Sequence, residues 1–181
     1  GAGGNIGVSV GDDGIVLIDD QFAPLAPKIK AALKGITDKP VKFVINTHYH
    51  GDHTGGNEAF GESAPLVAHD NVRKRMSTEQ FMAAMNMRVA PSPREALPVV
   101  TFNDGVTFHI NDDSVSATHV AGAHTDGDVI VHFIKDNVVH MGDTFVRERY
   151  ALIAGDGGGG IEGLVNEIDR VLGVIDNNTR N

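Results

Sequence analysis

The chain of 181 residues contains no cysteine. This absence excludes disulfides, cysteine-based zinc sites and thiol nucleophiles. Positive charge is also scarce, because 15 lysines and arginines stand against 24 aspartates and glutamates, for a formal net charge of −9. Such a surface repels phosphate backbones and anionic lipids, so we expect neither nucleic acid nor a membrane as a partner. No apolar run reaches the roughly 18 residues that a membrane span needs.

The rest of the composition is ordinary. Hydrophobic residues make up 41% of the chain and charged residues 22%, which excludes a disordered or fibrous protein. The length and the lack of a linker or repeat predict a single domain over residues 1–181. Gly1 is not an initiator methionine and no signal-like segment follows it, so we expect the natural N-terminus to lie upstream. The compartment stays open between periplasmic or secreted and cytoplasmic.

Apolar runs and turn signals predict the order of the elements. Strands are expected at residues 6–10, 15–18, 41–47, 66–68, 99–102, 106–110, 115–120, 129–134 and 138–141. Helical spacing predicts amphipathic helices over 25–33 and 161–175. Strands with helices between them, followed by more strands, predict a layered α/β sandwich.

Two local signals predict further detail. Asn103-Asp104-Gly105 is typical of a hairpin turn, here between the strands at 99–102 and 106–110. Ser77 or Thr78 is expected to open another helix, because Gln80 lies at capping-box spacing from Ser77. Four methionines lie around this helix, and we expect them to pack in the core, with an apolar flap over a substrate cleft as the alternative. They are Met76, Met82, Met85 and Met87.

Four metal-capable side chains lie within six residues of one loop. The loop follows the strand expected at 41–47 and carries His48, His50, Asp52 and His53. Imidazole and carboxylate are the ligands that a zinc-type cation takes where cysteine is absent. Four ligands are more than one tetrahedral metal easily accepts from so short a loop. We therefore expect two metals about 3.5–4 Å apart, one on His48 and His50 and the other on Asp52 and His53.

This pattern resembles the His-x-His-x-Asp-His signature of the metallo-β-lactamase superfamily, and the resemblance extends through almost the whole chain. It implies that His124 completes the first metal site and that Asp143 bridges the two metals. It also implies that Asp19, at the end of the second strand, supports the metal loop from behind the ligands. The implied fold is an α/β fold, an αββα sandwich of two mixed β-sheets flanked by helices.

The chain departs from the family pattern at both ends. The family carries one more histidine near its C-terminus as a ligand of the second metal, and no histidine follows His140 here. The family also has strands before the point where this chain begins. We therefore expect a sandwich that is incomplete at both ends, with a second site one protein ligand short. Unpaired edges and uncovered apolar surface favour pairing, so we expect self-association, most simply as a homodimer, or loosely ordered terminal segments. A compact monomer in which water completes the second site is the alternative.

The resemblance implies a zinc-dependent hydrolase. A metal-bound or bridging hydroxide would attack a carbonyl-type or ester substrate, a small molecule of the β-lactam, lactone or thioester class. One or two Zn ions are the expected cofactor, with Fe or Mn as alternatives. Asp52 is the expected catalytic residue, since it could both ligate the second metal and orient the hydroxide. The alternative functions are a catalytically impaired metal-binding domain and an iron-using carrier or redox protein.

The remaining histidines are expected to be structural. His109, His119, His132 and His140 lie in strand patterns, and His69 lies at a strand end or helix cap. Nucleophilic serine chemistry has little support, because no Gly-x-Ser-x-Gly elbow is present. The glycine run at 157–160 lacks the Lys-Ser/Thr of a phosphate loop, so we expect an ordinary loop there.

Overall fold

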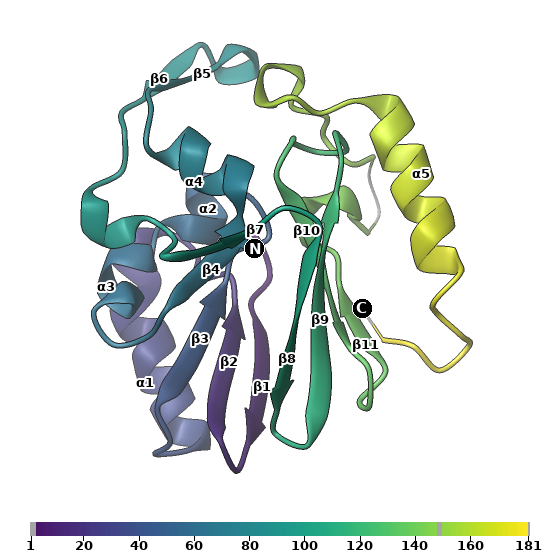
Figure 1. The fold of residues 1–181 in the computed structure, drawn as a ribbon. Coiled ribbons are helices and arrows are strands. Elements are labelled where there is room, and N and C mark those ends of the chain that lie inside the picture. The colour runs from purple at the N-terminus through teal and green to yellow at the C-terminus, as the bar shows by residue number, and fades with distance from the viewer. Residues whose placement is uncertain (1–2, 148–149, 181) are drawn as a thin grey trace.

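The structure is a computed structural model that describes residues 3–147 and 150–180. Two β-sheets pack face to face, with helices on both outer surfaces (Figure 1). The first sheet has the strand order β1-β2-β3-β4-β7. Its strands are β1 (Gly7–Gly11), β2 (Gly14–Ile18), β3 (Val41–Ile45), β4 (Leu66–His69) and β7 (Val100–Phe102). The β1–β2 pair is antiparallel and the other pairs are parallel, so this sheet is mixed.

The second sheet has the strand order β11-β10-β9-β8. Its strands are β8 (Gly105–Ile110), β9 (Asp113–Val120), β10 (Asp128–Phe133) and β11 (Val138–His140). All three pairings between these strands are antiparallel. The predicted αββα sandwich is confirmed, but this sheet is antiparallel where a mixed sheet was expected, because short turns connect its four strands in chain order.

Helices cover the outer faces of both sheets. Helices α1 (Ala26–Ile36), α2 (Gly51–Thr54), α3 (Asn57–Gly61) and α4 (Asp70–Met76) belong to the first half, and α5 (Ile161–Leu172) covers the second sheet. Pro27 lies in the first turn of α1, where a missing N–H is harmless. The predicted helices at 25–33 and 161–175 are thus confirmed. None of the helices in the described parts of the chain is long and apolar enough to cross a membrane.

The period of two in the strands distributes the core between the layers. On β2, Val16 and Ile18 pack between the two sheets, whereas Ile15 and Leu17 pack under α1. Burying each such side chain contributes about 1.5–3 kcal/mol. A third cluster joins α5 to the second sheet through residues such as Leu164. These three clusters of buried side chains hold the strands in place. The loops discussed below follow the upper ends of these strands in Figure 1.

The predicted hairpin at Asn103-Asp104-Gly105 is wrong. Strand β7 pairs in parallel with β4, with Val67 opposite Val100, while β8 pairs with β9. The turn therefore carries the chain from one sheet to the other. A turn signal specifies a reversal of the backbone, but pairing partners are decided by burial on the faces of the strands.

The helix predicted to open at Ser77 or Thr78 is also wrong. Ser77 is the C-cap of α4, where its N–H donates to the carbonyls of Arg73 and Arg75. The Gln80 amide donates back to the Arg75 carbonyl, so this side chain closes a turn that ends a helix. A small hairpin of β5 (Gln80–Met82) and β6 (Met87–Val89) follows.

The methionines divide accordingly. Met76 is buried on α4, as expected, whereas Met85 and Met87 are exposed in and beside the hairpin, contrary to the core prediction. The hairpin is held to the far side of the molecule where the Ala83 N–H donates to Asp156 Oδ2, 2.5 Å away.

Candidate metal centre

All of the predicted ligands lie at one end of the sandwich, in the loops and short helical turns that follow the strands. Asp19 follows β2, His48 and His50 follow β3, and Asp52 and His53 lie on α2. His124 comes from the loop between β9 and β10, and Asp143 from the short 3-10 turn Gly142–Thr144 after β11. Residues from both sheets therefore meet at one edge, where strand ends leave a crevice for a site.

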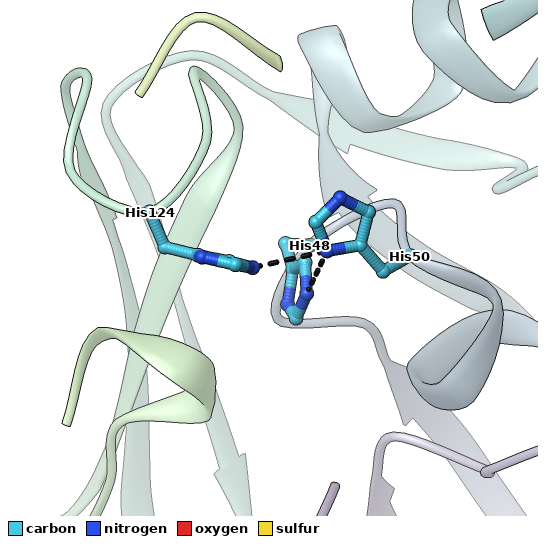
Figure 2. Close-up of side chains that lie close together, drawn as sticks. All are labelled: His48, His50 and His124. Atoms are coloured by element: carbon cyan, nitrogen blue, oxygen red, sulfur yellow. Dashed lines mark hydrogen bonds between the residues drawn. The ribbon is translucent and has the colours of Figure 1, made fainter. Parts of the chain in front are cut away.

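Three histidines converge on one point (Figure 2). His50 Nδ1 lies 3.0 Å from His48 Nε2 and 3.0 Å from His124 Nε2. All three side chains are buried, and the three nitrogens lie within 4.8 Å of one another. A single proton on His50 Nδ1 could bridge one of these contacts but not both. Tetrahedral ligands about 2.0–2.1 Å from a zinc ion lie about 3.3 Å apart, so the three nitrogens are spaced as ligands would be.

Hydrogen bonds behind the rings fix which nitrogen faces the centre. His124 Nδ1 lies 2.6 Å from the carbonyl oxygen of Leu152 and must donate to it, which leaves Nε2 as a lone pair. The Thr47 hydroxyl donates to Asp19 Oδ2 and so accepts from His48 Nδ1. His48 Nε2 is therefore also a lone pair. The donor set suits a cation and is prepared for it before the cation binds.

The charge state agrees with this reading. Burial, reinforced by the neighbouring histidines, holds the pKa of His48 well below its usual range. Burial likewise lowers the pKa of His50 to about 4. Both rings are neutral at physiological pH, as metal ligands must be.

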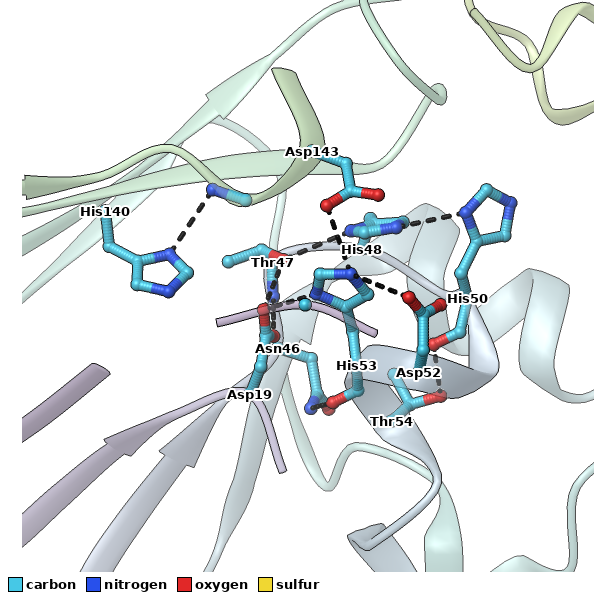
Figure 3. Close-up of polar contacts among 12 residues, drawn as sticks. Asp19, Asn46, Thr47, His48, His50, Asp52, His53, Thr54, His140 and Asp143 are labelled. Atoms are coloured by element: carbon cyan, nitrogen blue, oxygen red, sulfur yellow. Dashed lines mark hydrogen bonds and ion pairs between the residues drawn. The ribbon is translucent and has the colours of Figure 1, made fainter. Parts of the chain in front are cut away.

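A second group lies beside the first (Figure 3). His53 Nε2 lies 3.2 Å from Asp143 Oδ1 and 3.5 Å from Asp52 Oδ2. The other Asp143 oxygen lies 3.9 Å from His124 Nε2. Asp143 thus stands between the two groups, in the position that a bridging carboxylate would need. Its side chain and that of Asp52 are 33% and 29% exposed, so the second group faces solvent.

Asp19 holds the second group from behind. Its Oδ2 accepts from His53 Nδ1 at 2.7 Å, and its Oδ1 accepts from the Thr47 N–H at 2.7 Å. His53 Nε2 is thereby directed at Asp143. Burial alone would lower the pKa of His53, yet Asp19 and Asp143 raise it to about 10. The pocket has an excess of negative charge that draws a positive charge to this point.

Comparison with known proteins places this geometry in a family. The family model of the metallo-beta-lactamase superfamily matches residues 2–172. The chain belongs to the metallo-beta-lactamase superfamily. A solved structure titled TTHA1623 in a di-iron-bound form shares its fold, with a TM-score of 0.73 and 21% identity over 94% of this chain and 82% of that one.

Two curated relatives of this metallo-beta-lactamase superfamily member are longer proteins. The linear primary-alkylsulfatase of Pseudomonas sp. (strain ATCC 19151) is 35% identical over 99 residues, which cover 54% of this chain and 18% of the relative. The hydroxyacylglutathione hydrolase of Pelagibacter ubique (strain HTCC1062) is 24% identical over 119 residues, 64% of this chain and 41% of the relative. The chain thus spans less than half the length of either.

The structure brings the predicted site residues of this superfamily member together in two groups. His48, His50 and His124 form one, and His48, His53 and Asp143 form another within the same 4.8 Å limit. Asp52 lies at the rim, beside His53 Nε2. Asp19 lies behind the ligands, as the resemblance implies. Their role as ligands remains a prediction.

The histidines outside the two groups lie as expected. His69 ends β4 and caps α4, because its Nδ1 accepts from the Asn71 N–H. His119 lies on β9, where its Nδ1 donates to the carbonyl oxygen of Asp128. His140 ends β11 and accepts from the Gly142 N–H.

Sequence reasoning missed the segment that holds His124. The glycine run was expected to be an ordinary loop, but residues 152–163 wrap the His124 loop. A Cβ on Gly163 would lie 2.0 Å from the Gly122 carbonyl oxygen, and one on Gly159 would lie 2.2 Å from that of His124. The Gly160 N–H donates to the Ala123 carbonyl. Gly163 lies in the first turn of α5, where glycine is unusual, and this could have indicated a close backbone contact from the sequence alone.

Proposed function

We propose that this chain is a metal-dependent hydrolase that acts on a small molecule with a carbonyl-type or ester centre. The observation that carries the proposal is the convergence of three buried histidine nitrogens beside a partly exposed pair of carboxylates. The fold family and the tautomers fixed by Leu152 and Thr47 support it.

The two groups define which residues would hold metal. His48, His50 and His124 would hold one ion, and Asp52, His53 and Asp143 a second. When bound, such ions lower the pKa of water towards about 7 and polarise the oxygen of the scissile bond. Zinc suits imidazole and carboxylate ligands, and iron and manganese suit them as alternatives.

The protein's own groups orient the reaction. Asp52 is the solvent-facing carboxylate beside His53, so it is placed to orient the attacking water and to accept its proton. Asp19 keeps Nε2 of His53 directed at the centre by accepting from Nδ1. Tyr49 packs its ring on His50, with centroids 4.5 Å apart, and restricts that ring's rotation.

A cavity that Asp143 lines, without any of the ligand histidines, is the space proposed for a small substrate. It has a volume of about 670 Å³ and lies between the segment of residues 3–9 and β11, extending to residues 145–147. Small-molecule sites commonly measure about 300–1,000 Å³. β-Lactams, lactones and thioesters are the classes we propose, and the names of the curated relatives add sulfate esters and a glutathione thioester. The net charge of −9 argues against nucleic acid and anionic membranes.

Elemental analysis combined with a substrate panel tests the proposal. The purified protein should hold one or two zinc ions per chain and hydrolyse at least one member of a panel of β-lactams, lactones, thioesters and sulfate esters. Asp52→Asn should keep the ion on His48, His50 and His124, weaken binding of the second ion and lose turnover. His109→Ala, at an exposed histidine on β8, should change neither metal content nor turnover. A protein that holds no zinc, iron or manganese would overturn the proposal.

A catalytically impaired metal-binding domain is the second candidate. It is favoured by the second group, which offers one histidine and two carboxylates where the first offers three histidines. In that case the protein would bind metal through His48, His50 and His124 and hydrolyse nothing in the panel after loading with zinc, iron or manganese.

We also propose a homodimer paired through the edge strand β1. This strand ends the first sheet, and its Val8 and Val10 side chains are exposed. Light scattering at micromolar concentration should report twice the chain mass, and Val8→Lys should restore the monomer. A monomer in the wild-type protein would refute this assembly and leave the metal assignment unaffected.

A further inference from the structure

A glutamate is buried on the inner face of α5. Glu167 is 1% exposed and lies in the layer where Leu164 and Val171 pack against the second sheet. Its Oε1 lies 2.5 Å from the Thr144 hydroxyl oxygen, and its Oε2 is buried without a hydrogen-bond partner. An ionised carboxylate in this place would leave one charged oxygen unsolvated, which is costly.

Counting hydrogens assigns the proton. The Thr144 hydroxyl oxygen also lies 2.6 Å from the carbonyl oxygen of Met141. The hydroxyl has a single hydrogen, and a carbonyl oxygen can only accept. Both contacts are satisfied only if Thr144 donates to Met141 and accepts from Glu167. Glu167 is therefore the donor and carries the proton.

The surroundings favour the same state. Burial is the main cause that raises the pKa of Glu167, to about 8, and the charge of Asp128 on β10 adds to it. Arg170, one turn further along α5, donates to the carbonyl of His119.

The chain of bonds ends at a predicted metal ligand. Thr144 closes the turn Gly142–Thr144, since both its N–H and its hydroxyl donate to the Met141 carbonyl. Asp143 lies within this turn, with Oδ1 3.2 Å from His53 Nε2. We propose that Glu167 is a positioning residue that, as a neutral acid, locks Thr144 and thereby holds Asp143 in place to receive the second metal ion. This inference rests on the proposed function, in which Asp143 is a metal ligand.

The first test measures the thermal stability of the metal-free protein against pH, for the wild type and Glu167→Gln. The glutamine keeps a donor for Thr144 and cannot ionise. Between about pH 4.5 and 8 the folded wild type keeps a proton that the unfolded chain has lost, so its stability falls as pH rises. The melting temperature of Glu167→Gln minus that of the wild type should therefore grow across this range. A difference that stays constant with pH would overturn the protonated state.

The second test titrates the protein with Zn²⁺ by calorimetry. Glu167→Ala should lower the affinity for the second zinc ion by about 10- to 100-fold, the usual effect of removing a group that supports a metal ligand. Glu167→Gln should restore binding to near the wild-type value, which a purely structural defect would not predict. Glu162→Ala, on the exposed face of the same helix, is the control. Equal second-ion affinity in Glu167→Ala and the wild type would overturn the positioning role.

Asp143→Asn separates this inference from the proposed function. If Asp143→Asn binds two zinc ions as the wild type does, Asp143 is not a ligand, and the proposed second site and the positioning role both fail. If Asp143→Asn loses the second ion while Glu167→Ala keeps it, only the positioning role is overturned. Should Glu167→Ala fail to fold, Thr144→Val is the substitute variant. It removes the hydroxyl that Glu167 contacts, with little change of shape, and it should weaken binding of the second ion in the same way.

Discussion

The two ligand groups are built on opposite principles. His48, His50 and His124 are buried, and burial lowers the pKa of His48 and His50. In the second group Asp52 and Asp143 reach solvent, and carboxylates raise the pKa of His53 to about 10. The first group offers lone pairs that no proton occupies. The second group offers negative charge, which keeps a proton on His53 until a metal cation replaces it.

This difference separates geometry from charge as sources of metal affinity. The first group is fixed by hydrogen bonds that His124 Nδ1 donates to the Leu152 carbonyl and His48 Nδ1 donates to the Thr47 hydroxyl, so it loses little freedom when a metal binds. The second group depends on Asp19 and on the turn that carries Asp143. We therefore expect the first group to bind tightly and with little dependence on pH, and the second group to bind more weakly.

The largest effect should come from His48, which belongs to the first group and also has a ring nitrogen within 4.8 Å of the ligand atoms of His53 and Asp143. His48→Ala removes one of three converging lone pairs, so the first-group metal should be lost altogether after dialysis. Emission spectroscopy of the dialysed protein measures the metal content, with His109→Ala as the matched histidine control. Full metal retention in His48→Ala would break the assignment of the first group.

A smaller effect should follow from Asp19→Asn. The amide cannot provide the charge that Asp19 Oδ2 presents to His53 Nδ1, so the second-group affinity for zinc should fall by about 10- to 100-fold. The first group should change less, because Asp19 reaches it only through Thr47. Zinc titration measures both affinities, and Asp38→Asn, on an exposed loop, is the control. Equal losses at both groups would contradict the separation.

The pH dependence should distinguish the groups next. Because the pKa of His53 is raised to about 10, a metal bound there must displace a proton, and the affinity should rise about tenfold per pH unit. The pKa of His50 is lowered to about 4 and that of His48 lies well below its usual range, so protons should not compete for these two rings above about pH 5. Zinc titrations between about pH 5.5 and 7.5 should give a steep slope for one ion and a flat one for the other. Two equal slopes would remove the distinction.

The smallest effect should come from the contact between α5 and the His124 loop. A methyl group at Gly163 would lie 2.0 Å from the Gly122 carbonyl oxygen, so Gly163→Ala should destabilise the fold by about 1–3 kcal/mol. Gly35→Ala, in α1 with no neighbour within 4 Å, should instead stabilise it by about 0.4–1 kcal/mol. Urea denaturation measures both. Equal stabilities for the two variants would show that α5 does not fix this loop.

The ligand loop was predictable because its information is local. Four ligating side chains within six residues leave few other interpretations, and the strand before them is marked by its own apolar run. The two candidate ligands outside this loop, His124 and Asp143, could be predicted only from the resemblance to the family. An isolated histidine or aspartate in a turn is ordinary and would not be recognised as a ligand. The strands and the two long helices followed from periodicity.

What the sequence hid was pairing between distant segments. Nothing near Asn103-Asp104-Gly105 shows that β7 belongs beside β4, since the partner lies about 30 residues earlier and is chosen by burial. The helix expected at Ser77 failed because the same residue types serve at either end of a helix. The links from Leu152 to His124 and from Glu167 to Thr144 join distant parts of the chain, with no local pattern to mark them.

The ligands come from both halves of the sandwich, and His50 and His124 are 74 residues apart. A metal ion held by both would therefore be a reversible cross-link that closes a long loop between the two sheets. These sheets are otherwise joined by side-chain packing and by a few hydrogen bonds, such as that from the Val129 N–H to the Thr47 carbonyl. Such a cross-link restricts the unfolded chain, and loss of the ion removes that restriction. Loss of the ion and separation of the sheets would therefore be coupled. Removal of the metal by a chelator would then speed unfolding along the seam between β2 and β10, while each sheet kept its own strand pairing. The proposed metal centre would then also stabilise the fold.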